Sequence, residues 1–178
     1  MSGPAPIAHW VSLVLVIGAL LLQVTLLPSV TPSGVRPDLI LVVILGIGVF
    51  NGIGWDTFAV ALLGGMMLDF LSGHLIGLNI MIYLLSVTAA FRVLDMFTRA
   101  NAAIFVVMSA SFALLAELIR ALAVFLSGAH LGPIPVVLLI ATTAAAYTGV
   151  VAVLVYFIMG RYISSQEPQW GWERGARR

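Results

Sequence analysis

The chain has 178 residues, of which 62% are hydrophobic and 8% are charged, and its mean hydropathy is +1.16. Soluble domains carry about 25% charged residues, so this chain has too few to cover the surface of a soluble globule. Eight basic and seven acidic residues leave a net charge of +1, which argues against nucleic acid as a partner. There is no cysteine, which excludes disulfide scaffolds, thiol chemistry and cysteine-ligated metals. The composition therefore predicts an integral membrane protein.

Six apolar segments approach the roughly 20 residues that a membrane-spanning helix needs. Short stretches rich in Pro, Gly, Ser or charged residues separate them, and none of these stretches is long enough for a soluble domain. We expect an all-α polytopic membrane protein, with a compact six-helix transmembrane bundle over residues 1–160 and a polar cytoplasmic tail over 161–178. In chain order, the predicted helices run from about Trp10 to Pro28, Asp38 to Phe50, Thr57 to Leu71, Gly77 to Phe91, Ala102 to Leu126 and Val136 to Met159.

The placement of arginine predicts the orientation of these helices. An even number of spans puts both termini on one side of the membrane, and arginine is enriched in cytoplasmic loops. The opposite side holds only Arg36, and Arg120 lies inside a helix. We therefore expect a multi-pass protein of the cytoplasmic membrane with both termini in the cytoplasm. The arginines on the terminal side are Arg92, Arg99, Arg161, Arg174, Arg177 and Arg178.

Asp69 is the first charged group that we expect inside the membrane. It lies one turn before Ser72 and Gly73, where the third predicted helix ends. An unpaired charge in the bilayer costs at least about 2.5–3.5 kcal/mol, so this carboxylate needs a partner. Either it accepts hydrogen bonds from the turn over 72–79, which is a structural role, or it forms a site for a cation, a proton or a donor of another protein.

Glu117 and Arg120 form the second such site. Their spacing of three places them on one face of the fifth predicted helix, where they can pair. Arg120 can also extend toward the outer end of that helix. The pair is either structural or a contact with the helix of another protein. Of the fifteen charged residues, we expect only Asp69, Glu117 and Arg120 at membrane depth.

Stripes of small residues mark where helices can approach each other closely. Such stripes serve either the internal packing of the chain or contact with a partner helix. The predicted packing positions are Gly48 and Gly52, Gly64 and Gly65, and Ala141, Ala145 and Gly149.

Motifs of enzymes are missing from the sequence. There is no Ser/His/Asp set at hydrolase spacing, no GxSxG, no HExxH and no glycine-rich phosphate loop. We therefore expect a protein that is not an enzyme and that holds no cofactor and no metal.

Three neighbouring motifs carry a family resemblance. Arg36-Pro37-Asp38-Leu39 opens the second predicted helix, the segment over 64–73 (GGMMLDFLSG) closes the third, and the segment over 74–79 (HLIGLN) leads into the fourth. Together with the length of the chain, these resemble the rod shape-determining protein MreD family of bacteria. The resemblance implies a scaffold of the cell-elongation machinery in the cytoplasmic membrane. Glu117 and Arg120 match nothing diagnostic of that family.

The resemblance also implies partners. MreD-like proteins work with the bitopic membrane protein MreC, and they help to couple MreB filaments to peptidoglycan synthesis by RodA and the elongation-specific penicillin-binding protein. We expect polar contacts with such a partner, or structural contacts, at Asp69 and Asn79 and at Arg36 and Asp38. The family is also similar in topology to the substrate-binding subunits of energy-coupling-factor transporters. The alternative function is therefore a small-solute, vitamin-like binding subunit of a transporter.

Overall fold

The computed structural model describes residues 9–25, 35–51, 54–72, 76–96, 101–128 and 132–163. These residues form helices and no strand, which confirms the predicted all-α class. The helices are α1 (His9–Thr25), α3 (Leu39–Asn51), α4 (Trp55–Ser72), α5 (Leu78–Met96), α6 (Ala102–Leu126) and α7 (Ile134–Ile163).

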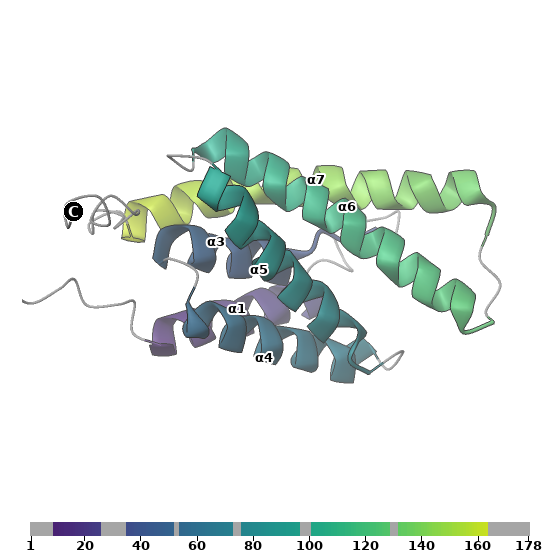
Figure 1. Cartoon of the computed structure of the whole chain (residues 1–178), viewed down its shortest axis with the longest axis horizontal. Coiled ribbons are helices and arrows are strands. Elements are labelled where there is room, and N and C mark those ends of the chain that lie inside the picture. Colours follow the sequence, from purple (N-terminus) through teal and green to yellow (C-terminus); the bar gives the residue numbers. More distant parts are fainter. Residues whose placement is uncertain are drawn as a thin grey trace, which may run out of the picture.

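Successive helices run up and down the long axis of the molecule (Figure 1). As a result, α1 begins and α7 ends at the same end of the bundle (Figure 1). Helix α6 packs along α7, and α4 packs along α5. Helix α3 touches all five of the other described helices, which makes it the centre of the fold.

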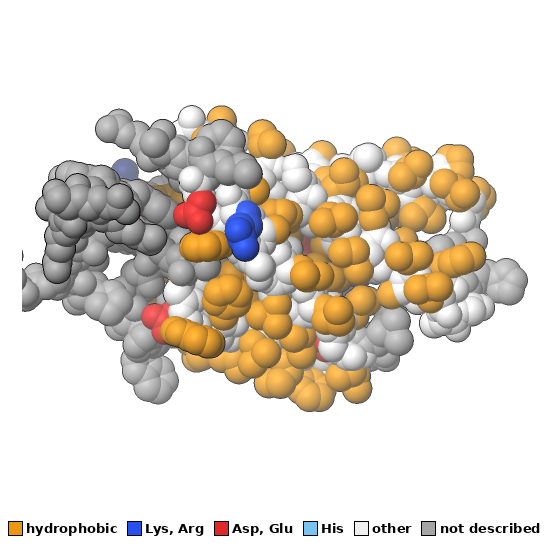
Figure 2. Space-filling model, in the orientation of Figure 1, with side chains coloured by type: hydrophobic (Ala, Val, Ile, Leu, Met, Phe, Trp, Pro, Cys, Tyr) orange, Lys and Arg blue, Asp and Glu red, His pale blue; other side chains and the backbone are white. Residues whose placement is uncertain are grey.

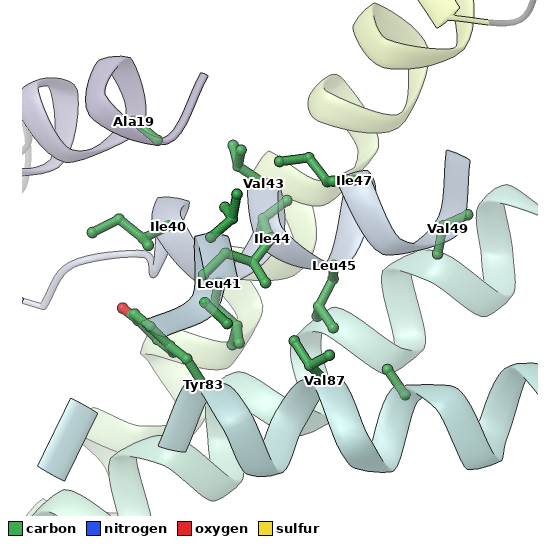
Figure 3. Close-up of a cluster of buried hydrophobic side chains, with 14 of the residues drawn as sticks. Ala19, Ile40, Leu41, Val43, Ile44, Leu45, Ile47, Val49, Tyr83 and Val87 are labelled. Atoms are coloured by element: carbon green, nitrogen blue, oxygen red, sulfur yellow. The ribbon is translucent and has the colours of Figure 1, made fainter. Parts of the chain in front are cut away.

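The composition of α3 explains its central position. Every residue from Ile40 to Val49 is buried, and the segment is apolar on all sides, as expected of a helix surrounded by others. Figure 3 shows side chains such as Ile44, Leu45 and Ile47 pointing away from α3 in different directions, with Tyr83 and Val87 of α5 beside it. At 13 residues, α3 is about 20 Å long at 1.5 Å per residue, which is shorter than the roughly 30 Å hydrocarbon core of a bilayer.

Two helices extend beyond their predicted ends. We expected the fourth predicted helix to end near Phe91, but α5 continues to Met96. Arg92 and Asp95 are exposed in this last part, so the polar residues that we took for a loop continue the helix at its solvated end. Helix α7 likewise continues to Ile163 instead of ending near Met159, and the rest of the predicted tail lies outside the described residues.

Asn101 explains why α6 begins where the sequence predicts. Its backbone is extended, and its side-chain oxygen accepts a hydrogen bond of 2.9 Å from the backbone N–H of Ile104. This arrangement satisfies one of the N–H groups that a helix leaves without a partner in its first turn. The helix then runs from Ala102 to Leu126, which are the predicted bounds.

Three of the described helices are long and apolar enough to cross a membrane. These stretches are Leu78–Asp95 in α5, Ala102–Leu126 in α6 and Ile134–Arg161 in α7. Shorter apolar stretches lie in α1 (Val11–Thr25) and α3 (Leu39–Phe50). The face shown in Figure 2 is covered mainly by hydrophobic side chains. Helices of this length with apolar outer faces indicate association with a membrane.

Candidate functional site

A group of polar side chains meets inside the bundle where α3 and α5 begin. We call it the polar cluster, and it brings together residues that lie up to 110 positions apart in the chain. Its members come from α4, α5, α6 and α7 and from the residue directly before α3, so the polar cluster joins five of the described helices. The polar cluster consists of Asp38, Asp69, Asn79, Tyr83, Glu117, Arg120 and Thr148.

Asp38 is the centre of the polar cluster and caps α3. Its Oδ1 accepts hydrogen bonds from the backbone N–H of Leu41 at 3.1 Å and from the hydroxyl of Tyr83 at 2.8 Å. Its Oδ2 accepts one from Arg120 Nη2 at 2.8 Å, and its own backbone N–H donates to Thr148 Oγ1 at 3.1 Å. Asp38 lies at the predicted boundary of its helix, immediately before α3. It is only 4% exposed, because the helix that it caps begins inside the protein.

Helix α3 receives a further contact at the same end. Gln23 of α1 accepts a hydrogen bond of 3.2 Å from the backbone N–H of Ile40 through its Oε1. A helix end buried without such partners would leave costly unsatisfied N–H groups. Side chains from two other helices therefore help Asp38 to satisfy the buried start of α3.

Arg120 connects three members of the polar cluster. Its Nη1 lies 2.6 Å from Glu117 Oε1, its Nη2 binds Asp38, and its Nε donates to Asn79 Oδ1 at 3.0 Å. The pairing with Glu117 that the spacing predicts is therefore present. Arg120 does not extend toward the helix end, because its guanidinium is held by Asp38 and Asn79. The side chains of Arg120 and Glu117 are 23% and 26% exposed.

Asp69 caps the start of α5 from a neighbouring helix. Its carboxylate accepts hydrogen bonds from the backbone N–H groups of Gly77 (2.9 Å), Asn79 (3.0 Å) and Ile80 (3.4 Å), and from Asn79 Nδ2 at 2.8 Å. A carboxylate at a helix N-terminus is favoured by the helix dipole and by these N–H groups. Gly77 has a φ of +96°, which a residue with a side chain rarely adopts. These contacts agree with the structural alternative for Asp69, in which its carboxylate accepts hydrogen bonds from the turn that follows α4.

Gly64 and Gly65 lie where α4 meets its neighbours. A Cβ added at Gly65 would lie 2.6 Å from Ile80 Cα and 2.8 Å from Ile80 N, and one at Gly64 would lie 3.0 Å from Ile40 Cγ2. Only glycine at position 65 allows the backbone of α5 to approach this closely. This approach holds Asp69 within reach of the N–H groups that it binds.

The other predicted packing positions are divided between two helices and an undescribed segment. In α7, Ala141, Ala145 and Gly149 are buried, and a Cβ added at Gly149 would lie 3.5 Å from Ala110 Cβ of α6. Gly48 is buried in α3, and Gly52 lies outside the described residues.

Arg36 does not belong to the polar cluster. It lies two positions before Asp38 in the chain, and it is exposed. Within the described ranges, no three His, Asp or Glu side chains lie close enough together to hold a metal ion. Apart from the Glu117–Arg120 pair within α6, the contacts described above for the polar cluster join one helix to another or satisfy a helix end. The arrangement is suited to fixing the positions of helices.

Sequence reasoning missed the contacts between Asp38, Tyr83, Thr148 and Arg120. These residues lie on separate helices, and their meeting depends on the order of helices in space. One signal was present, because an arginine and an aspartate in an otherwise apolar chain each need a counter-charge. Charge pairing alone would have suggested Asp38 as a second partner of Arg120.

Comparison of the chain with protein-family models, with curated proteins and with solved structures found no match. The resemblance to the MreD family therefore stays a prediction drawn from the motifs over 36–39 and 64–79.

Proposed function

We propose that this protein is a non-enzymatic scaffold of the bacterial cytoplasmic membrane that serves the cell-elongation complex. In this proposal, it crosses the membrane six times with both termini in the cytoplasm. It binds an MreC-like bitopic membrane protein and helps to couple MreB filaments to peptidoglycan synthesis by RodA and the elongation-specific penicillin-binding protein.

One observation carries the scaffold proposal, namely that the polar side chains bind each other inside the bundle and leave its outer faces apolar. Asp38, Asp69, Asn79 and Arg120 are engaged with each other and with helix ends, whereas the outer faces of α6 and α7 are apolar. Helices associate in membranes through packing and a few interhelical hydrogen bonds. A rigid bundle with broad apolar faces is suited to binding other transmembrane helices.

The arrangement of helices supports the six-span topology. The helices alternate in direction, and α1 begins at the end of the bundle where α7 finishes (Figure 1). Helix α3 is short, but Asp38, Gln23 and Thr148 surround its first turn. A helix that begins at membrane depth is tolerated where protein groups satisfy its backbone. Arg161 in the last turn of α7 agrees with a cytoplasmic end for that helix.

The cavity between α5 and α6 gives little support to the alternative of a vitamin-like binding subunit. A small-solute pocket combines an apolar wall with several polar anchors. The cavity between these two helices has a volume of about 370 Å³. Its lining fits an acyl chain or an apolar side chain better than a polar solute. The lining residues are Val93, Ala103, Ile104, Val107, Met108, Ser111 and Phe112.

A complementation experiment tests the proposed function. The chain would be produced in a rod-shaped bacterium from which the MreD protein has been removed, and the ratio of cell length to width would be measured by microscopy. Recovery of rod shape with the wild-type chain is the expected result. A protein that is present in the membrane at normal levels and leaves the cells round would contradict the proposal.

A further inference from the structure

The C-terminal half of α6 and the N-terminal half of α7 separate from each other. Figure 1 shows the two helices diverging toward the ends that the segment after Leu126 connects. Where they are in contact, a Cβ added at Gly149 would lie 3.5 Å from Ala110 Cβ and 3.9 Å from Val106 Cγ1. Gly149 and Ala110 therefore mark the sides by which α7 and α6 face each other.

Helical spacing extends these facing sides toward the open end. Residues seven, eleven and fourteen positions beyond Ala110 share its side of α6, and these are Glu117, Ala121 and Val124. On α7, Thr142 and Leu138 share the side of Gly149 for the same reason. We call the space between these five positions (Glu117, Ala121, Val124, Leu138 and Thr142) the α6–α7 wedge.

The facing side of α7 becomes exposed as the wedge opens. Gly149 and Ala145 are buried, whereas Thr142 is exposed and Leu138 is 49% exposed. From Ile134 to Ile140, α7 has no buried residue on any side. Because α6 covers so little of this part of α7, an apolar surface is left open, which is typical of an interaction site.

Glu117 lies at the base of the α6–α7 wedge, and only one of its two carboxylate oxygens binds Arg120. Its Oε1 receives Arg120 Nη1, while no donor in the described part of the chain reaches its Oε2. Leu126, at the end of α6, lies nine positions after Glu117, which is about 14 Å of helix. If α6 ends at the membrane surface, that distance places the oxygen near the middle of a roughly 30 Å hydrocarbon core.

The charges around Glu117 leave a negative excess. Two carboxylates, those of Asp38 and Glu117, share the single guanidinium of Arg120. An acyl chain can fill an apolar wedge, but it brings neither a hydrogen-bond donor nor a positive charge for Oε2. Charge complementarity therefore favours a protein side chain over lipid.

We propose that the α6–α7 wedge receives one transmembrane helix of a partner protein, and that a basic side chain near the middle of that helix binds Glu117. The proposal rests on the proposed scaffold function and deepens it, because it names the docking surface and the chemistry of the partner. A second copy of this chain does not meet the requirement within its described spans, since Arg120 is already bound by Asp38 and Glu117, and Arg92 and Arg161 lie near the ends of their helices.

Photo-crosslinking in native membranes tests the proposal. A photoreactive amino acid would replace Leu138 in the wedge or, as a control, Leu85, which is 57% exposed on α5, a helix without contact to α7. The expected product at position 138 joins the chain to a transmembrane segment that carries a lysine, arginine or histidine within one turn of the attachment point. The probe at position 85 should not give this product.

Two substitutions then test the chemistry. Glu117→Gln keeps an acceptor for Arg120 but removes the charge, and it should lower the yield of the product about tenfold, the change expected for the loss of about 1.4 kcal/mol. Asp95→Asn removes a carboxylate from the exposed end of α5 and should leave the yield unchanged. Replacing the basic residue of the partner by leucine should have the effect of Glu117→Gln, and combining both changes should add little to either. Gel filtration of each variant in detergent checks that it is folded.

The results separate the wedge from the proposed function. A crosslinked helix that lacks a basic residue, a yield that Glu117→Gln leaves unchanged, or products with lipid or a second copy alone would each overturn the wedge proposal. If the basic helix belongs to an MreC-like protein, both proposals hold. If it belongs to a protein outside the elongation machinery, the wedge proposal holds and the proposed function fails.

Discussion

The close approach of α4 and α5 at Gly65 makes a sharp prediction for the Gly65→Ala variant. The new Cβ would lie 2.6 Å from Ile80 Cα and 3.0 Å from the carbonyl carbon of Asn79. Both neighbours are backbone atoms, so no side-chain rotation relieves the overlap. An ordinary contact begins near 3.4 Å, so the two helices must separate by about 0.8 Å.

This displacement would act on the cap that Asp69 provides. Its hydrogen bonds with the N–H groups of Gly77 and Asn79 are 2.9 and 3.0 Å long, and a separation of about 0.8 Å takes both beyond the range of a normal hydrogen bond. Overpacking costs about 1–3 kcal/mol and a lost cap about 0.5–2 kcal/mol. The better helix propensity of alanine returns about 0.5–1 kcal/mol. We expect Gly65→Ala to lower the free energy of unfolding by about 2–3 kcal/mol.

Unfolding by SDS in mixed micelles, followed by circular dichroism, measures this change. The matched control is Gly18→Ala in α1, because a Cβ added there has no atom within 4 Å. That variant should be as stable as the wild type or more stable by up to about 1 kcal/mol. If Gly65→Ala unfolds at the same SDS concentration as Gly18→Ala, the reasoning about the contact between α4 and α5 is refuted.

The same titration checks three further predictions about buried polar groups. Arg120→Met should lower the free energy of unfolding by about 3–5 kcal/mol, because it leaves the buried carboxylate of Asp38 without its counter-charge. Adding Asp38→Asn should recover at least about 1 kcal/mol of this loss. A double variant that is less stable than Arg120→Met would contradict the pairing. Tyr83→Phe should lower the free energy of unfolding by about 1.5–3 kcal/mol, since the Tyr83 hydroxyl donates a 2.8 Å hydrogen bond to the carboxylate of Asp38. An unchanged midpoint of the SDS titration would show that this bond contributes nothing to stability. Ser109→Ala should leave stability unchanged or raise it by about 1 kcal/mol, because the fully buried Ser109 Oγ has no hydrogen-bond partner among the described residues; a clear loss would reveal a partner for this hydroxyl.

Local signals in the sequence predict the parts of the fold that depend on neighbouring residues. The bounds of α6 follow from an apolar run behind a capping Asn101, and the pairing of Glu117 with Arg120 follows from their spacing. The cap that Asp69 provides also follows from a short turn, because only eight positions separate it from Gly77. Each of these inferences needs no knowledge of which helices are neighbours.

The rest of the site depends on the order of helices in space. Asp38 and Arg120 are 82 positions apart, and Asp38 and Thr148 are 110 positions apart, so no periodicity connects them. Polarity also misled the prediction of helix ends, because Arg92 and Asp95 continue α5 with their side chains exposed. One general signal was available for the centre of the fold, since an all-apolar segment such as 40–49 has no side that prefers water.

Affinity purification of the tagged full-length chain from native bacterial membranes, with mass spectrometry of the proteins that remain bound, tests the scaffold proposal most directly. The proposal predicts an MreC-like bitopic membrane protein as the main specific companion, with less of it recovered when the folded Glu117→Gln variant is used. Recovery of the ATPase and transmembrane subunits of a vitamin transporter, with no component of the elongation machinery, would contradict the proposal.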